Sequence, residues 1–175
     1  MPAHRPIPDS YWVEPGRLLA GEYPRDRDDT SSLIKLRRLL EAGVTLFLDL
    51  TEEGEHGLKP YLALLRQEAA NLDRDVIHQR VPIPDGRTPA SATMSRILDE
   101  IDAALAQGHV TYVHCFGGIG RTGTVAGCYM VRHGISGEAA LDKIAHLREG
   151  TPDGWRIAPE TEAQRQMVRS WREGS

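Results

Sequence analysis

The sequence has few cysteines, no long apolar run and no excess of positive charge. Only two of its 175 residues are cysteine, too few for a disulfide framework, so nothing in the composition indicates secretion. No apolar run approaches the ~20 residues that a membrane helix requires, and the opening MPAHRPIPDSYW lacks the apolar stretch of a signal peptide. The net charge of -4 argues against a nucleic-acid binder, which would normally carry a basic stripe. We therefore expect a cytoplasmic protein that binds neither nucleic acid nor a membrane.

The size and composition are those of an ordinary globular protein. The 175 residues suit one domain with a proper core, and the hydrophobic fraction of 40% and charged fraction of 26% are unremarkable. We expect a single domain over residues 1–175, with residues 1–10 as an extended N-terminal tail, and a monomeric state.

Strand-like and helix-like segments alternate along the chain. Short extended pieces occupy residues 12–23, and apolar runs typical of buried strands follow at 44–50, 76–81 and 109–114. Apolar residues at helical spacing, with cap candidates at Thr30 to Ser32, Ser91 and Ser136, predict helices over residues 30–43, 60–72, 91–108, 122–134, 137–150 and 159–171. This alternation predicts an α/β fold, in which helices flank a central, mainly parallel sheet of about four or five strands.

The stretch VHCFGGIGRTG, residues 113–123, lies between a predicted strand and a predicted helix. α/β folds place their ligands at such junctions. Glycines there allow successive backbone N–H groups to turn inward and form a nest for an anion, to which the helix N-terminus adds its positive dipole. A cysteine at the mouth of this nest, Cys115, is expected to be a thiolate, because the amides, the dipole and Arg121 favour its charged form. We expect Phe116, Gly117, Gly118, Ile119 and Gly120 to form the phosphate-binding loop.

These residue types suit phosphoryl transfer through a covalent cysteinyl phosphate. Arg121 follows Cys115 by six positions and can grip two oxygens of a tetrahedral anion. Asp85, in the loop VPIPDGRTP after another strand, is the candidate general acid for the leaving oxygen. Thr122 is a candidate to donate its hydroxyl to the thiolate, and Gln164 is a candidate to position the attacking water.

Several side chains have a competing structural interpretation. His114 is expected to support the loop by hydrogen bonding rather than to shuttle protons. Asp85 alternatively caps a turn, because Pro-Asp-Gly is common turn chemistry, and Gln164 alternatively lies on a solvated helix face. Cys128 fits the apolar side of a helix and is interpreted as a core residue. The role of Phe116 is open between packing beneath the loop and lining the pocket, and that of Arg87 between substrate binding and none.

The acidic segment and the histidines carry no assigned chemistry. Glu52, Glu53 and Glu55 are interpreted as a solvated loop after a strand, with shaping of the pocket rim as the alternative. No histidine shows metal-ligand spacing, so no metal and no cofactor are expected.

The loop resembles a known signature. HCFGGIGRTG is similar to the HCxxGxxRTG motif of cysteine-dependent protein tyrosine and dual-specificity phosphatases. VPIPDGRTP, the roughly thirty-residue gap from Asp85 to Cys115, the GGIGR loop and TEAQRQM near the end resemble the kinase-associated phosphatase (cyclin-dependent kinase inhibitor 3) branch. GRLLAGEYP resembles the entry strand of small dual-specificity phosphatases. The resemblance implies that Cys115 is the nucleophile, Arg121 the phosphate binder and Asp85 the acid.

The resemblance implies a metal-independent phosphatase acting on phosphorylated protein. Lipid-directed relatives usually carry lysines inside the loop, whereas residues 116–120 contain none, which favours a single phosphate on a protein. Phosphotyrosine is the expected target, with phosphothreonine or phosphoserine left open. The alternatives are a phosphatase for a lipid, inositol or nucleotide monoester, a phosphate-binding pseudoenzyme, and a rhodanese-like sulfurtransferase.

Overall fold

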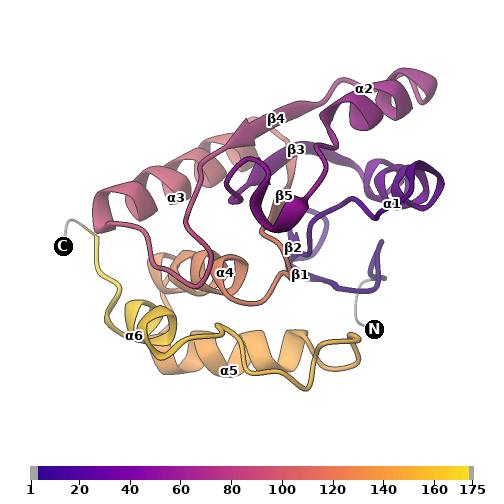
Figure 1. Ribbon diagram of the computed structural model, residues 1–175. Coiled ribbons are helices and arrows are strands. Elements are labelled where there is room, and N and C mark those ends of the chain that lie inside the picture. Colours follow the sequence, from indigo (N-terminus) through magenta and orange to yellow (C-terminus); the bar gives the residue numbers. More distant parts are fainter. Residues whose placement is uncertain (1–3, 174–175) are drawn as a thin grey trace.

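Within residues 4–173, which the computed structural model describes, the chain forms a five-stranded sheet with helices on both faces (Figure 1). Its strands are β1 (Ser10–Glu14), β2 (Leu18–Gly21), β3 (Val44–Asp49), β4 (Ile77–Arg80) and β5 (Val110–His114). Their spatial order is β1-β2-β5-β3-β4. β1 and β2 pair antiparallel, and the other three pairs are parallel. The predicted α/β fold with a mainly parallel sheet is confirmed.

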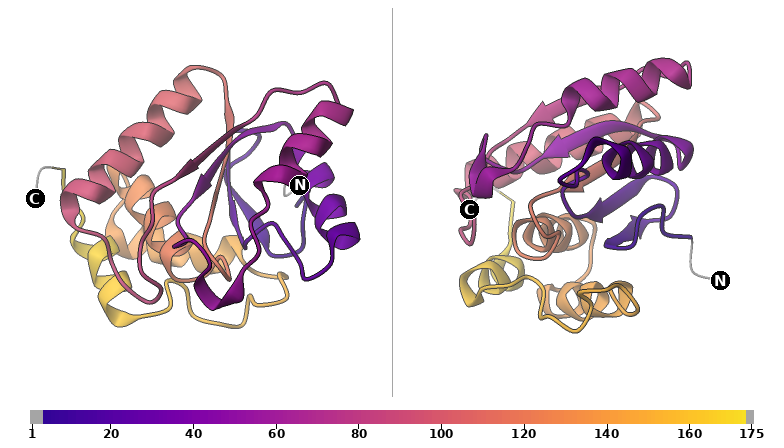
Figure 2. Two further views of the ribbon diagram at one scale, coloured as in Figure 1. Left: turned by 45° about the horizontal axis from the view of Figure 1, so that its top comes forward. Right: turned by 45° about the vertical axis from the view of Figure 1, so that its right-hand side comes forward.

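Helices divide between the two faces of the sheet (Figure 2). They are α1 (Asp29–Glu41), α2 (Leu62–Asn71), α3 (Ser91–Ala106), α4 (Arg121–Arg132), α5 (Gly137–Leu147) and α6 (Glu162–Ser170). α1 and α2 bury one apolar cluster with Phe47 and Tyr112, and the other four helices bury a second with Leu48 and Val113. Strand residues therefore alternate between two cores. None of the helices in the described range is long and apolar enough to span a membrane.

Two of the predicted helix starts were wrong. α1 is capped by Asp28, whose carboxylate accepts a hydrogen bond from the Ser31 N–H at 2.8 Å, so the cap precedes the predicted Thr30 to Ser32. Ser91 is the first residue of α3 rather than its cap, and no side chain caps that helix. Ser136 caps α5 as predicted.

The N-terminal segment is more packed than an extended tail. Residues 6–9 bend and turn before β1 begins at Ser10, and Ile7 is 1% exposed within the cluster under α1 and α2. Burial of Ile7 explains the difference, because an apolar side chain is stabilised by leaving water. Residues 1–3 of the predicted tail lie outside the described residues.

Parallel pairing brings both predicted site segments to one edge of the sheet. β3, β4 and β5 end there at Asp49, Arg80 and His114, in register with one another. The loop with Asp85 follows β4, and the loop with Cys115 follows β5 and leads into α4 (Figure 1). α4 is held between α3, α5 and α6, so its N-terminus is fixed against this edge.

The contact between α4 and α6 depends on Gly127. An added Cβ there would lie 2.6 Å from one methyl carbon of Val168, a fully buried residue of α6. The absence of a side chain thus sets the distance between the two helices.

We expect Gly127→Ala to destabilise the fold by about 1–3 kcal/mol, because the extra methyl overpacks this contact. Urea unfolding gives the change in free energy. In a protein that already carries Val168→Ala, the contacting methyl groups are gone, so Gly127→Ala should reduce the free energy of unfolding by less than it does in the wild type. An unchanged midpoint for Gly127→Ala would contradict the packing described here.

Candidate active site

The loop after β5, residues 115–120, is called the Cys115 loop. It lies directly against the end of β2: an added Cβ at Gly118, whose φ is 72°, would be 2.4 Å from the carbonyl carbon of Gly21. A side chain at position 118 would therefore push the loop away from the sheet. The N–H of Tyr23 donates to the carbonyl of Phe116 at 2.9 Å and ties the loop to the segment after β2.

The backbone of the Cys115 loop offers unpaired donors. No N–H of residues 116–120 donates a hydrogen bond to another described residue of the chain. α4 begins immediately afterwards, and its cap residue Gly120 contributes no side-chain bond to the free N–H groups of the first turn. Because these donors follow Cys115 and precede a helix, the loop is suited to bind a tetrahedral anion next to the thiol.

Arg121 is held from one edge of its guanidinium. Its side chain is 1% exposed, and Glu55 binds Nη1 at 2.6 Å and Nη2 at 2.7 Å through its two oxygens. Nη1 also donates to the carbonyl of Ile83 at 2.8 Å. Nε is buried and has no hydrogen-bond partner among the described residues. The edge formed by Nε and Nη2 is therefore the one that can receive oxygens of an anion.

Glu55 corrects the interpretation of the acidic segment as a solvated loop. Its side chain is only 8% exposed, and it lies in a short 3-10 turn, η1 (Glu55–Gly57), after β3. The physical reason is that a buried guanidinium requires a counter-charge, and this turn lies at the same sheet edge. Glu52 and Glu53 are exposed, as expected.

Asp85 lies between Arg121 and His56. Its Oδ1 is 3.2 Å from Nη2 of Arg121, and its Oδ2 is 2.7 Å from Nε2 of His56. Partial burial favours the protonated carboxyl, but the hydrogen bond with His56 and the charge of Arg121 outweigh it and lower the pKa of Asp85. The carboxylate is thus poised beside the anion site, in its charged form at neutral pH.

His114 supports the loop through two hydrogen bonds. Nδ1 is 3.3 Å from the carbonyl oxygen of Cys115, and Nε2 is 2.7 Å from the hydroxyl of Tyr61. Because a carbonyl only accepts, Nδ1 carries the proton and Nε2 accepts from Tyr61. Burial lowers the pKa of His114, which agrees with a neutral imidazole. The arrangement matches the predicted supporting role.

Thr122 and Gln164 make contacts other than those expected. The Thr122 hydroxyl donates to the carbonyl of Gly21 at 3.4 Å, at the end of β2, so in this arrangement its proton is not directed to the thiol. Gln164 is fully buried, and the alternative of a solvated helix face is wrong. Its amide completes a capping box with Thr161 and donates to the carbonyl of Arg87 at 3.3 Å. Its role with water stays a prediction.

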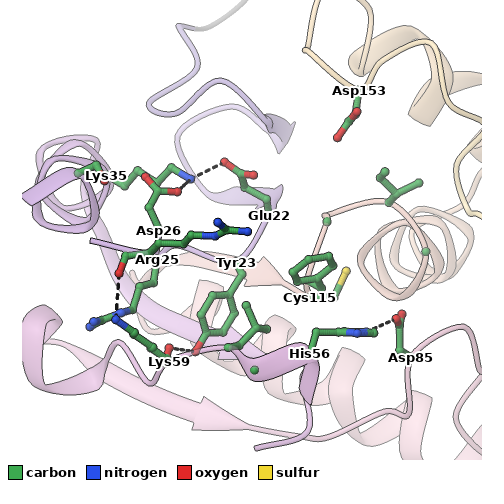
Figure 3. A pocket seen from close by; sticks show the side chains of 18 of the residues that line it. Glu22, Tyr23, Arg25, Asp26, Lys35, His56, Lys59, Asp85, Cys115 and Asp153 are labelled. Carbon is green, nitrogen blue, oxygen red and sulfur yellow. Dashed lines mark hydrogen bonds and ion pairs between the residues drawn. The ribbon is translucent and has the colours of Figure 1, made fainter. Parts of the chain in front are cut away.

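A pocket of about 870 Å³ opens over the Cys115 loop (Figure 3). Phe116 is 47% exposed at its mouth, with its ring centroid 5.1 Å from that of His56, so it does not pack beneath the loop. The Arg87 side chain is exposed, and the pocket lining does not include it. The pocket extends toward the segment between β2 and α1. Its charged rim consists of Glu22, Arg25, Asp26, Arg27, Asp28, Lys35, Lys59, Asp153, Arg156 and Glu160.

One group of described residues has the geometry of a metal site. Ligand atoms of Glu55, His56 and Asp85 lie within 4.8 Å of one another. However, the Arg121 guanidinium binds both oxygens of Glu55 and contacts Asp85, so positive charge already lies among these ligands. We therefore assign the group to Arg121 rather than to a metal.

Sequence reasoning missed Glu55, His56 and Tyr61. One signal could have indicated the first two: they follow β3, whose carboxyl end lies at the ligand-binding edge of a parallel sheet. Tyr61 precedes α2 and reaches His114 from the chain's first half, and no local pattern points to that contact.

Comparisons with known proteins agree with this geometry. The family described as "Swiss Army Knife protein, DSP-PTPase phosphatase domain" (PTP-SAK) matches residues 8–175. Human cyclin-dependent kinase inhibitor 3 is 37% identical over 75 residues, which are 42% of this chain and 35% of that protein. The chain thus covers about a third of that relative's length. The active form of Tk-PTP superimposes with a TM-score of 0.71 at 25% identity, over 92% of this chain and 94% of that one. Kinase associated phosphatase (KAP) gives 0.72 at 23% identity, over 96% and 93%, which shows the fold alone.

Behind the Cys115 loop, Asp49 anchors the end of β3 with no exposed surface. His78 lies 3.1 Å and Arg80 3.2 Å from its Oδ2, and Thr51 donates to Oδ1. Burial alone would raise the pKa of Asp49, but the hydrogen bonds with His78 and Thr51 hold it well below its usual value.

We expect Asp49→Asn to reduce the free energy of unfolding at neutral pH by about 2 kcal/mol. Because the pKa of Asp49 is lower in the folded state than in the unfolded state, its carboxylate stabilises the fold at pH values above the unfolded-state pKa of about 3.9. This stabilisation is lost as the pH falls from there through the folded-state pKa. The difference between wild type and variant should therefore shrink in acid, as measured by urea unfolding across the acid range. A difference that stays constant with pH would contradict the assignment.

Proposed function

The chain belongs to the family of DSP-PTPase phosphatase domains described as Swiss Army Knife proteins, and on this basis we propose that it is a protein phosphatase. The proposed substrates are phosphotyrosine and, secondarily, phosphothreonine and phosphoserine in proteins. The observation that carries the proposal is the unpaired anion site: free loop N–H groups and the unpartnered Nε of Arg121 lie beside a thiol and a carboxyl group.

In the first step, the Cys115 thiolate attacks phosphorus in line with the leaving oxygen. Loop N–H groups and the Nε–Nη2 edge of Arg121 hold the non-bridging oxygens, where negative charge is present in the transition state. The S–P bond forms, the P–O bond breaks, and Asp85 gives a proton to the departing oxygen.

In the second step, water attacks the cysteinyl phosphate. Asp85 accepts a proton from this water, the new P–O bond forms, and the thiolate leaves. Inorganic phosphate is released and Cys115 returns to its starting form. Because loop amides and Arg121 supply the electrostatic stabilisation, we expect no metal requirement.

Three of the five cations on the pocket rim are paired with carboxylates, whereas Arg27 and Lys59 form no ion pair with a described residue, and this partial compensation favours a protein substrate over a polyphosphate. Lys35 lies 2.9 Å from Glu22 and 2.7 Å from Asp26, so its charge is compensated. Arg25 pairs with Asp29, and Arg156 pairs with Glu160. An inositol polyphosphate or lipid headgroup would require uncompensated cations for its further phosphates. A protein substrate instead offers mixed charges and, in phosphotyrosine, a ring for the exposed Phe116.

Two of the similar proteins have names that point the same way, whereas PTPMT1 in complex with PI(5)P corresponds to the alternative of a lipid substrate. Cyclin-dependent kinase inhibitor 3 and kinase associated phosphatase are both named for their relation to kinases, which are proteins. This supports a phosphoprotein as substrate without identifying it. The cytoplasmic location and the monomeric state stay predictions.

We expect phosphate release from phosphotyrosine peptide in the presence of a chelator, with loss of turnover in Cys115→Ser and retained binding of phosphate. The matched control is Cys128→Ala, because Cys128 is fully buried in α4 and burial raises the pKa of its thiol to about 12. A panel adds phosphothreonine and phosphoserine peptides, a phosphoinositide and a nucleotide monophosphate. Turnover of only the last two would refute the protein substrate and leave the chemistry intact.

We expect Asp85→Asn to lower kcat on phosphotyrosine peptide by about 10²-fold, because the leaving oxygen loses its proton donor. Asp102→Asn serves as control: Asp102 pairs with His133 at 2.8 Å, at the other end of α4. A near-normal rate for Asp85→Asn would remove Asp85 as the acid.

A further inference from the structure

His56 is positioned unusually for a surface histidine. It is the middle residue of η1 and adopts φ 51° and ψ 22°, a left-handed conformation that non-glycine residues rarely take. Such strain tends to persist where the surrounding structure requires a particular side-chain placement. Here the conformation directs the imidazole into the catalytic pocket, toward Asp85 (Figure 3).

The imidazole is fixed by contacts from three segments of the fold. Nε2 is 2.7 Å from Oδ2 of Asp85, in the loop after β4, and 3.7 Å from Oε2 of Glu55, in its own turn. The ring lies against Phe116 of the Cys115 loop, at an interplanar angle of 38°. His56 therefore holds the other oxygen of the carboxyl group that Arg121 contacts.

The contacts of Asp85 pose a chemical problem for a general acid. A carboxyl group paired with Arg121 and His56 is ionised in the free protein, since these partners lower its pKa, and an ionised carboxylate has no proton to give. Three groups contact this carboxylate: the Arg121 guanidinium, the His56 imidazole and the Gly86 N–H. Of these donors, imidazole is the side chain that acts as a proton shuttle in catalysis.

We propose that His56 supplies the proton that Asp85 passes to the leaving oxygen, and that it takes back the proton released by water in the second step. This inference rests on the proposed phosphatase function and names an additional residue for it. His56 acts through Asp85, so it is a positioning residue that also stores the proton.

The proton balance closes over one turnover. When the P–O bond breaks, the leaving oxygen takes a proton from Asp85, and Asp85 takes the Nε2 proton of His56. When water attacks, it loses one proton to Asp85, which returns it to Nε2 as the S–P bond breaks. The titratable and charged groups that face the imidazole are Asp85 and Glu55, with Arg121 and Cys115 beyond them. The dianion of a bound monoester adds negative charge to this group and favours a proton remaining on the pair.

The first experiment compares two substrates that differ in their need for an acid. An aryl phosphate with a strongly acidic phenol leaves without a proton, whereas phosphotyrosine needs one. We expect His56→Gln to lower kcat/KM on phosphotyrosine peptide by about tenfold or more and to leave kcat/KM on the activated aryl phosphate within about twofold, because kcat/KM reports the steps up to departure of the leaving oxygen and not the later attack by water. The matched control is His133→Gln, because the His133–Asp102 pair has similar exposure and a 2.8 Å separation but lies away from the pocket.

The direction of the change separates this role from an electrostatic one. If His56 only lowered the pKa of Asp85, its removal would increase the protonated fraction and raise the phosphotyrosine rate. A decrease supports the proton-supplying role, and an increase or no change overturns it. In His56→Gly, added imidazole should restore the phosphotyrosine rate, an effect that a purely structural role would not produce. Failure of rescue together with equal losses on both substrates would also overturn the inference.

A double variant tests whether the two residues act as one unit. The rate losses caused by Asp85→Asn and by His56→Gln should not multiply. The double variant should have the same rate on phosphotyrosine peptide as Asp85→Asn alone. Multiplied losses would contradict a shared path for the proton.

The turnover of the activated aryl phosphate by the wild type is measured first, and it should be absent in Cys115→Ser. If the wild type does not turn over the activated aryl phosphate, the phosphatase function itself is refuted. If it does, but the His56 variants do not behave as expected, only the proton supply by His56 is refuted.

Discussion

The buried ion pair between Arg121 and Glu55 is the interaction on which the site depends. Both guanidinium Nη atoms bind the two oxygens of Glu55, and this leaves the Nε side of Arg121 for an anion. Removing either partner would leave a buried charge without its counter-charge, which is strongly unfavourable. The pair also joins the turn after β3 to the start of α4. Asp85 is placed relative to the anion site because it contacts the same guanidinium.

The surrounding fold fixes the position of this ion pair relative to the Cys115 loop. Parallel strands end together, so three loops meet at one sheet edge, and the close approach of Gly118 to Gly21 presses the Cys115 loop against β2. Tyr61 fixes the tautomer of His114 by a hydrogen bond, and His114 in turn donates to the carbonyl of Cys115 in the loop. These contacts hold the loop donors in place, which is the basis of electrostatic preorganisation.

The fold class and the loop could be predicted because their signals are local. A strand, a glycine loop and a helix follow one another in the sequence, and Asp85 follows a strand that ends at the same edge. Glu55 and His56 could not be assigned in the same way. Their segment looks like a solvated acidic loop, and only the buried charge of Arg121, 66 positions later, turns Glu55 inward. The cap at Asp28 was missed because several consecutive residues there have capping side chains.

The paired charges of the pocket rim also determine how a substrate arrives. Lys35, Arg25 and Arg156 are each paired with nearby carboxylates, and the whole chain carries a net charge of -4, so the attractive field of the pocket is weaker than its number of cations would give. Encounter with a phosphorylated protein then depends mainly on diffusion and orientation, with weak long-range steering. Selectivity then arises after contact. It depends on how long the phosphate of a preferred substrate stays bound in the Cys115 loop compared with the phosphate of another substrate.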